Sequence, residues 1–220
     1  MDREIKAAKA LEIKKPETKV ISFPKNIKYG TANQKIQTLV MDTFSDTRND
    51  YLLSLMEVAK YSLMILRSNT PLAEPIYEEI FKSCGHGKDA MMATEFTIAM
   101  TATGKDLLMD QAFNLSEEDL REMKIPDDVI KAISLLGKLG KQENLEYGGP
   151  EFTKILKKVK KDPLARIVKM ADLIDKINLA PKIFRGIIKQ DCIEASKYAD
   201  QLKFLTDNLA YHGSKEKILE

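Results

Sequence analysis

One stretch of the chain, Lys161–Lys176, constrains the fold most, because it places carboxylates on the side of a helix that should be buried. Pro163 suits the first position of a helix, where its missing N–H would be unpaired in any case. At about 100° per residue the apolar side chains then form one stripe: Leu164, Ile167, Val168, Ala171 and Ile174. Asp175 falls inside this stripe and Asp172 lies at its edge. Four residues are expected on the far side: Arg166, Lys169, Leu173 and Lys176.

A carboxylate that faces a core needs a cation, a metal ion or several hydrogen-bond donors, because burying an unpaired charge costs several kcal/mol. We therefore expect a positive group to meet Asp172 and Asp175. The simpler alternative is that one of these acids pairs with an ordinary lysine or caps a neighbouring helix.

Composition favours a mostly helical protein with one core. The chain has 220 residues, of which 44% are hydrophobic and 31% charged, with ten glycines and no tryptophan. No apolar run approaches membrane-spanning length, and the first residues lack the apolar core of a signal peptide, so we expect a cytoplasmic protein with no membrane partner. Cys84 and Cys192 have no metal-ligand spacing and are expected to be reduced thiols.

The net charge is only +2, which argues against a general nucleic-acid binder, so nucleic acid is not an expected partner. Positive charge is nevertheless uneven along the chain. Residues 1–36 hold nine Lys and Arg against four Asp and Glu, and residues 137–161 hold seven Lys against three Glu. Either segment could be a solvated face or a rim that faces phosphates.

Helical spacing and turn signals divide the chain into three parts. Residues 1–45 are lysine-rich and are predicted to form an irregular arm, extended or partly ordered, with one β-like run at 19–23. Residues 46–212 are predicted to form an all-α bundle, and residues 213–220 a flexible tail. The predicted helices cover about 50–66, 72–83, 89 onward, 116 onward, 127–140, 152–161, 163 onward, 181–190 and 191–209.

Two segments resemble a known family: Ile125–Ile133, IPDDVIKAI, and Asp162–Asp172, DPLARIVKMAD. They are similar to the HD-domain phosphohydrolases, and most closely to the RelA/SpoT-type guanosine tetraphosphate (alarmone) hydrolase domains. The resemblance is strong over Leu120–Lys176 and weaker upstream. It implies an HD-domain-like helical bundle in which a histidine, an adjacent His-Asp pair and a distant Asp hold one divalent metal ion.

The resemblance also implies roles for individual residues. With a small loop insertion between residues 84 and 116, the segment Lys105–Asp110 aligns with the family's His-Asp-x-x-Glu-Asp. The metal ligands, if a metal binds, are then His86, Asp106 and Asp172, although a lone histidine beside glycines is more often a cap or a surface residue. Lys105 replaces the second histidine, and Met109 replaces the glutamate of the catalytic Glu-Asp pair.

These departures leave Asp110 as the retained half of the catalytic pair and place Lys176 where the relatives have an asparagine near the nucleotide. An ammonium among the ligands would repel a divalent ion, yet it would be stabilised between carboxylates. Lys105 is therefore expected to act as a metal-replacing cation beside Asp106, Asp172 and the buried Asp175. No cofactor is expected if the site is inactive. If the site is active, manganese or another divalent metal ion is expected to bind there.

Three functions remain open on these grounds. The first is a degenerate HD domain that binds a phosphorylated nucleotide such as guanosine tetraphosphate through Lys105 and Lys176, with little or no hydrolysis, as a sensor or regulator. The second is an active metal-dependent nucleotide pyrophosphohydrolase with an altered metal site. The third is a protein-interaction module, a homo-oligomer or a complex, in which residues 1–45 grip a partner chain.

Overall fold

The computed structural model describes residues 26–44, 49–68, 70–84, 87–183 and 189–206, and the regular elements of these residues are all helices. The helices are α1 (Asn26–Phe44), α2 (Asn49–Ser68), α3 (Thr70–Cys84), α4 (Lys88–Gly104), α5 (Glu117–Glu122), α6 (Asp127–Leu145), α7 (Pro150–Lys161), α8 (Pro163–Ile183) and α9 (Lys189–Thr206). The all-α prediction is confirmed for this part of the chain. The β-like run at 19–23 and the tail at 213–220 lie outside it.

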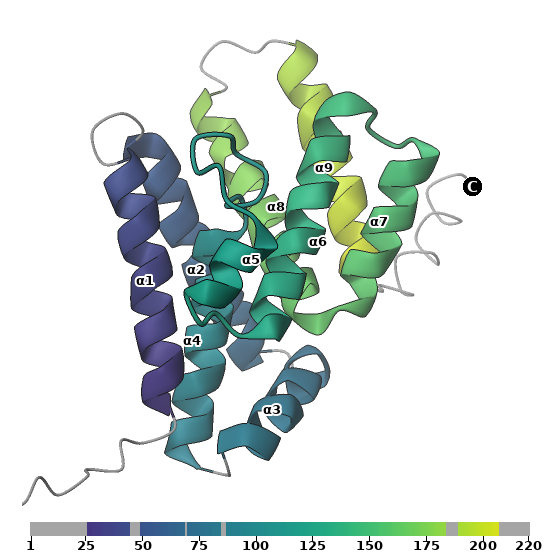
Figure 1. The fold of residues 1–220 in the computed structure, drawn as a ribbon. Helices are drawn as coiled ribbons and strands as arrows, with labels where there is room; N and C mark the ends of the chain where they lie inside the picture. Colours follow the sequence, from purple (N-terminus) through teal and green to yellow (C-terminus); the bar gives the residue numbers. More distant parts are fainter. Residues whose placement is uncertain (1–25, 45–48, 69, 85–86, 184–188, 207–220) are drawn as a thin grey trace, which may run out of the picture.

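Helix α8 is the central element of the bundle. It packs against α2, α3, α4, α6, α7 and α9, while α1 lies along α4 at one side of the molecule (Figure 1). Helices α6, α7 and α9 gather on the opposite side (Figure 1). None of the helices in the described ranges is both long and apolar enough to cross a membrane.

The predicted apolar stripe of α8 is largely buried, but its far side differs from the expectation. Leu164, Ile167, Val168 and Ala171 are all at most 5% exposed. Lys169 and Leu173, expected on the far side, are also buried, at 4% and 0% exposure. The reason is that neighbouring helices surround α8, so that it has almost no solvent-facing side.

Residues 26–44 of the predicted N-terminal arm lie within the described part of the chain, where they form the regular helix α1. Ala32, Ile36 and Val40 recur every four residues and are buried, which gives α1 one apolar face. Gly30 allows a close approach to the ring of Phe96 in α4, since a Cβ at position 30 would lie 3.3 Å from that ring. Helix α1 therefore packs on the bundle through small and branched side chains.

Two helix boundaries show how local signals succeed and fail. The predicted start at Ser116 is confirmed, because Ser116 and Asp119 form a reciprocal capping box at the start of α5. The predicted end of α6 near Gly137–Gly140 is wrong, since the helix continues to Leu145. A Cβ on Gly140 would collide with Met109 Sδ, so this glycine serves close packing against the segment after α4 and does not end the helix.

We predict that Gly104→Ala destabilises the protein. A Cβ at position 104 would lie 2.8 Å from Ile133 Cδ1 and 3.2 Å from Leu107 Cδ1, both in the core. Overpacking of this kind costs about 1–3 kcal/mol, which should exceed the gain of up to about 1 kcal/mol from removing a helical glycine. Urea denaturation measures the free energy of unfolding. Adding Ile133→Val, which removes the colliding methyl group, should recover part of the loss, and strictly additive effects would contradict this account.

Candidate functional site: a buried ion cluster

Six charged residues meet beside α8 and form what we call the ion cluster: Lys105, Asp106, Glu143, Lys169, Asp172 and Lys176. Lys105 and Asp106 directly follow the last residue of α4, in a tight turn held by backbone hydrogen bonds from Leu107 N to Gly104 O and from Asp110 N to Asp106 O. Glu143 comes from the last turns of α6. The other three residues lie on α8 at positions three or four apart, which places them on neighbouring turns.

Lys105 bridges two carboxylates that belong to different elements. Its Nζ lies 2.7 Å from Asp106 Oδ2 and 3.1 Å from Asp172 Oδ1, and its side chain is 13% exposed. Burial alone would lower the pKa of Lys105, but the charges of Asp172 and Asp106 outweigh burial and raise the pKa above its usual value. The ammonium therefore stays protonated in a place where it has little contact with water.

Asp172 is the acceptor at the centre of the ion cluster. Besides Lys105, it accepts Lys169 Nζ at 3.2 Å and Lys176 Nζ at 3.1 Å, both on Oδ2. Burial would raise the pKa of this carboxyl, but the three ammonium groups, with Lys105 first, hold the pKa well below its usual range. One buried carboxylate thus contacts three ammonium groups and balances part of the charge of each.

Glu143 is a second acceptor that the sequence reasoning missed. Lys169 Nζ lies 3.1 Å from both of its carboxylate oxygens, and Gln201 Nε2 of α9 donates to Oε1 at 2.7 Å. Burial would raise the pKa of Glu143, but Lys169 and Lys176 lower it. The sequence did contain a signal that Glu143 faces the core. It follows the buried Leu139 by four residues and the buried Leu136 by seven, which places all three on the same side of α6.

Helix α2 adds two hydroxyl groups to the site. Tyr51 OH donates to Asp106 Oδ2 at 3.0 Å, and Ser54 Oγ donates to Asp175 Oδ2 at 2.6 Å. Burial, followed by the negative charge of Asp106, raises the pKa of Tyr51 above its usual value, so the phenol remains a hydrogen-bond donor. Asp175 is buried as predicted, at 4% exposure. Its described partner is nevertheless Ser54, whereas Lys105 contacts Asp106 and Asp172.

The other predicted site residues lie at the edge of the ion cluster or beyond the described residues. Asp110 Oδ1 accepts a hydrogen bond from Ala112 N at 2.9 Å, and the charge of Asp110 contributes to the raised pKa of Tyr51. The side chain of Lys176 is 34% exposed, and its Nζ lies 5.3 Å from the centre of the Tyr198 ring in α9. His86 is outside the described residues, so its predicted role as a ligand stays a prediction.

The described side chains do not fit a divalent metal ion. In the described ranges, no three His, Cys, Asp or Glu side chains are grouped so that they could hold a metal ion. Asp106 and Asp172 do face a common point, but Lys105 Nζ occupies that point and repels a second cation. The arrangement is therefore an internally neutralised group of charges.

Comparisons of the chain with protein-family models, curated proteins and solved structures yield no match.

We predict that Lys105→Met destabilises the protein by on the order of 3 kcal/mol at neutral pH. Removing one partner of a buried ion pair leaves the other charge uncompensated, and Asp106 would keep only the hydrogen bond from Tyr51. Urea denaturation measures the loss. Lys82→Met is a matched control, because Lys82 and its partner Glu79 are 73% and 68% exposed and their pair should contribute less than about 1 kcal/mol. Equal losses in the two variants would contradict a structural role of the ion cluster.

The ion cluster should also limit stability at both ends of the pH range. The lowered pKa of Asp172 contributes stability above about pH 4, the ordinary value for an aspartate, which is lost as the pH falls further. The raised pKa values of Lys105 and Lys176 contribute stability below about pH 10.4, which is lost as the pH rises beyond it. We expect denaturant titrations across pH to show a broad plateau between these limits. A maximum confined to acidic pH would contradict this assignment.

Proposed function

We propose that the chain is a degenerate HD-type protein that binds a phosphorylated nucleotide and hydrolyses it slowly or not at all. One observation carries the proposal: the Lys105 ammonium lies between Asp106 and Asp172, the two carboxylates that the resemblance assigns to a metal. Hydrolysis by such a centre requires a metal ion to lower the pKa of a bound water molecule. An ammonium cannot supply that effect, because it is not a Lewis acid and cannot coordinate the oxygen of a water molecule.

The proposed binding position is the exposed edge of the ion cluster, where α8 meets α9. Lys176 is the most exposed of the three cluster lysines, and its Nζ lies over the ring of Tyr198, which is itself partly exposed. A nucleotide needs two contacts, one for its phosphate and one for its base. The ammonium of Lys176 can turn toward a phosphate, and the ring of Tyr198 is a surface on which a base can stack. Guanosine tetraphosphate is the first candidate, because the sequence resembles hydrolases of that nucleotide.

The same geometry weighs against the active-hydrolase alternative. For a metal to bind between Asp106 and Asp172, the Lys105 side chain would have to leave two carboxylates that hold it at 2.7 and 3.1 Å. The raised pKa of Lys105 means that the ammonium would also not deprotonate near neutral pH to make room for the metal. A charged lysine that remains in place excludes the ion by repulsion.

Isothermal titration calorimetry with guanosine tetraphosphate, GTP and GDP tests the proposal. We expect one of the guanosine nucleotides to bind, and Lys176→Ala to weaken its binding by about tenfold or more, as the loss of one charge-assisted contact implies. Lys82→Ala on α3 is the matched control, because it removes an exposed, equally charged side chain whose partner, Glu79, is outside the ion cluster. Binding that responds equally to both substitutions, or no binding of any of the three nucleotides, would refute the proposal.

Product analysis after incubation with manganese separates the two catalytic outcomes. We expect no pyrophosphate release above that of a chain carrying Asp172→Asn. Lys105→His, which removes the permanent cation and adds a metal-binding imidazole beside Asp106, should increase manganese binding measured by the same calorimetry. Rapid pyrophosphate release by the unaltered chain would establish the hydrolase alternative instead.

A further inference from the structure

The outer face of α7 carries a concentration of positive charge that the ion cluster does not use. The helix buries Phe152, Ile155, Leu156 and Val159 against the bundle. Its opposite face exposes four lysines that, with Gly148, Pro150 and Thr153, line a shallow hollow of about 520 Å³. We call these four residues the lysine row: Lys154, Lys157, Lys158 and Lys161.

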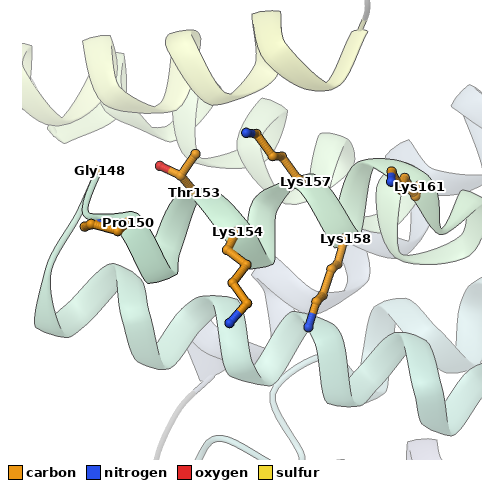
Figure 2. Close-up of a pocket in the computed structure, with 7 residues that line it drawn as sticks. All are labelled: Gly148, Pro150, Thr153, Lys154, Lys157, Lys158 and Lys161. Atoms are coloured by element: carbon orange, nitrogen blue, oxygen red, sulfur yellow. The ribbon is translucent and has the colours of Figure 1, made fainter.

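The lysine row occupies both edges of the exposed face. Figure 2 shows Lys154 and Lys158 pointing to one side of α7 and Lys157 pointing to the opposite side. Lysines four residues apart on a helix advance by about 6 Å along its axis. The four lysines are therefore spread over the last eight residues of α7, and a partner lying along the helix would meet them one after another.

Most of this charge is not balanced by acids among the described residues. Lys154 Nζ lies 3.2 Å from Glu151 Oε2, but Lys157, Lys158 and Lys161 make no ion pair with any described residue. The next acid along the chain, Asp162, is already engaged, because it accepts Lys131 Nζ at 3.0 Å and the backbone N–H of Ala165 at 3.0 Å. The attraction of the helix C-terminus for cations accounts for lysines in the last turn only, and Lys154 and Lys157 precede that turn.

We propose that the lysine row binds the sugar–phosphate backbone of a nucleic acid without reading its sequence. Backbone binding needs spaced cations, and the hollow is lined by lysines with Thr153 as the one other polar side chain. The small net charge of the whole chain does not contradict this proposal, because the phosphates would contact only the local positive charge on α7. This site is separate from the one proposed for a nucleotide beside Lys176.

Two other kinds of partner, an anionic membrane surface and an acidic protein, fit the lysine row less well. A membrane-surface helix presents its apolar face to lipid, whereas the apolar face of α7 is buried in the core. Stable protein interfaces centre on buried aromatic or apolar anchors, and α7 exposes no large apolar side chain. A phosphodiester backbone fits better, because it can bind exposed cations without an apolar face that inserts into lipid and without a buried apolar anchor.

Fluorescence anisotropy with the full chain tests the proposal. The two labelled probes are a duplex DNA and a single-stranded RNA, each about 20 nucleotides long. Each titration is repeated at potassium chloride concentrations between about 50 and 200 mM. We expect the logarithm of the affinity for duplex DNA to fall with the logarithm of salt concentration with a slope of about −3 to −4, which corresponds to four phosphate contacts. In a variant with Lys157→Gln, Lys158→Gln and Lys161→Gln the affinity should drop at least about tenfold, and the slope should approach about −1.

A second triple variant provides the matched control. Lys60→Gln, Lys82→Gln and Lys88→Gln remove the same number of exposed charges from α2, α3 and α4 and should leave the affinity nearly unchanged. Equal losses in the two variants would overturn the proposal, since they would show that net charge alone drives binding. Absence of binding at the lowest salt concentration, tighter binding to anionic phospholipid vesicles, or equal binding to polyglutamate would overturn it as well.

Discussion

The contact of the Lys105 ammonium with Asp106 and Asp172 is the interaction on which the interior of this bundle depends. Burying an ammonium or a carboxylate alone is costly, but each of these groups has a partner of opposite charge within 3.1 Å. Around this contact the network extends to α2 through Tyr51 and to α9 through the Glu143–Gln201 hydrogen bond. Segments far apart in the sequence are thereby tied to one charged centre inside the bundle.

Sequence reasoning could predict the parts of this arrangement that depend on local pattern. Helical spacing predicted the all-α architecture that the described residues show, and the capping box at Ser116 marked the start of a helix. The two acids of the helix that begins at Pro163 predicted a cation beside them, and Asp172 contacts three ammonium groups, whereas Asp175 accepts a hydrogen bond from Ser54. These inferences hold because a buried carboxylate must be compensated in any fold that contains it.

The remaining features required the tertiary structure. Lys169 was expected on the outside of α8, but the outside of this helix is covered by other helices, which a single amphipathic pattern cannot reveal. Glu143 was placed in a loop because Gly137 and Gly140 resemble helix ends, whereas Gly140 provides room for Met109. Ser54 could not be found as the partner of Asp175, because α2 and α8 are distant in sequence and a serine on a helix carries no specific signal.

The position of Lys105 in a turn after α4 has a kinetic consequence. Its ammonium reaches Asp172 only when the turn and α8, which are separated by α5, α6 and α7 along the chain, have come together. Contacts between distant segments carry a large loop-closure cost and tend to form late in folding. Interactions that are absent from the transition state act mainly on the rate of unfolding. The ion cluster is therefore suited to slow the opening of the finished bundle, while the apolar helices guide its assembly.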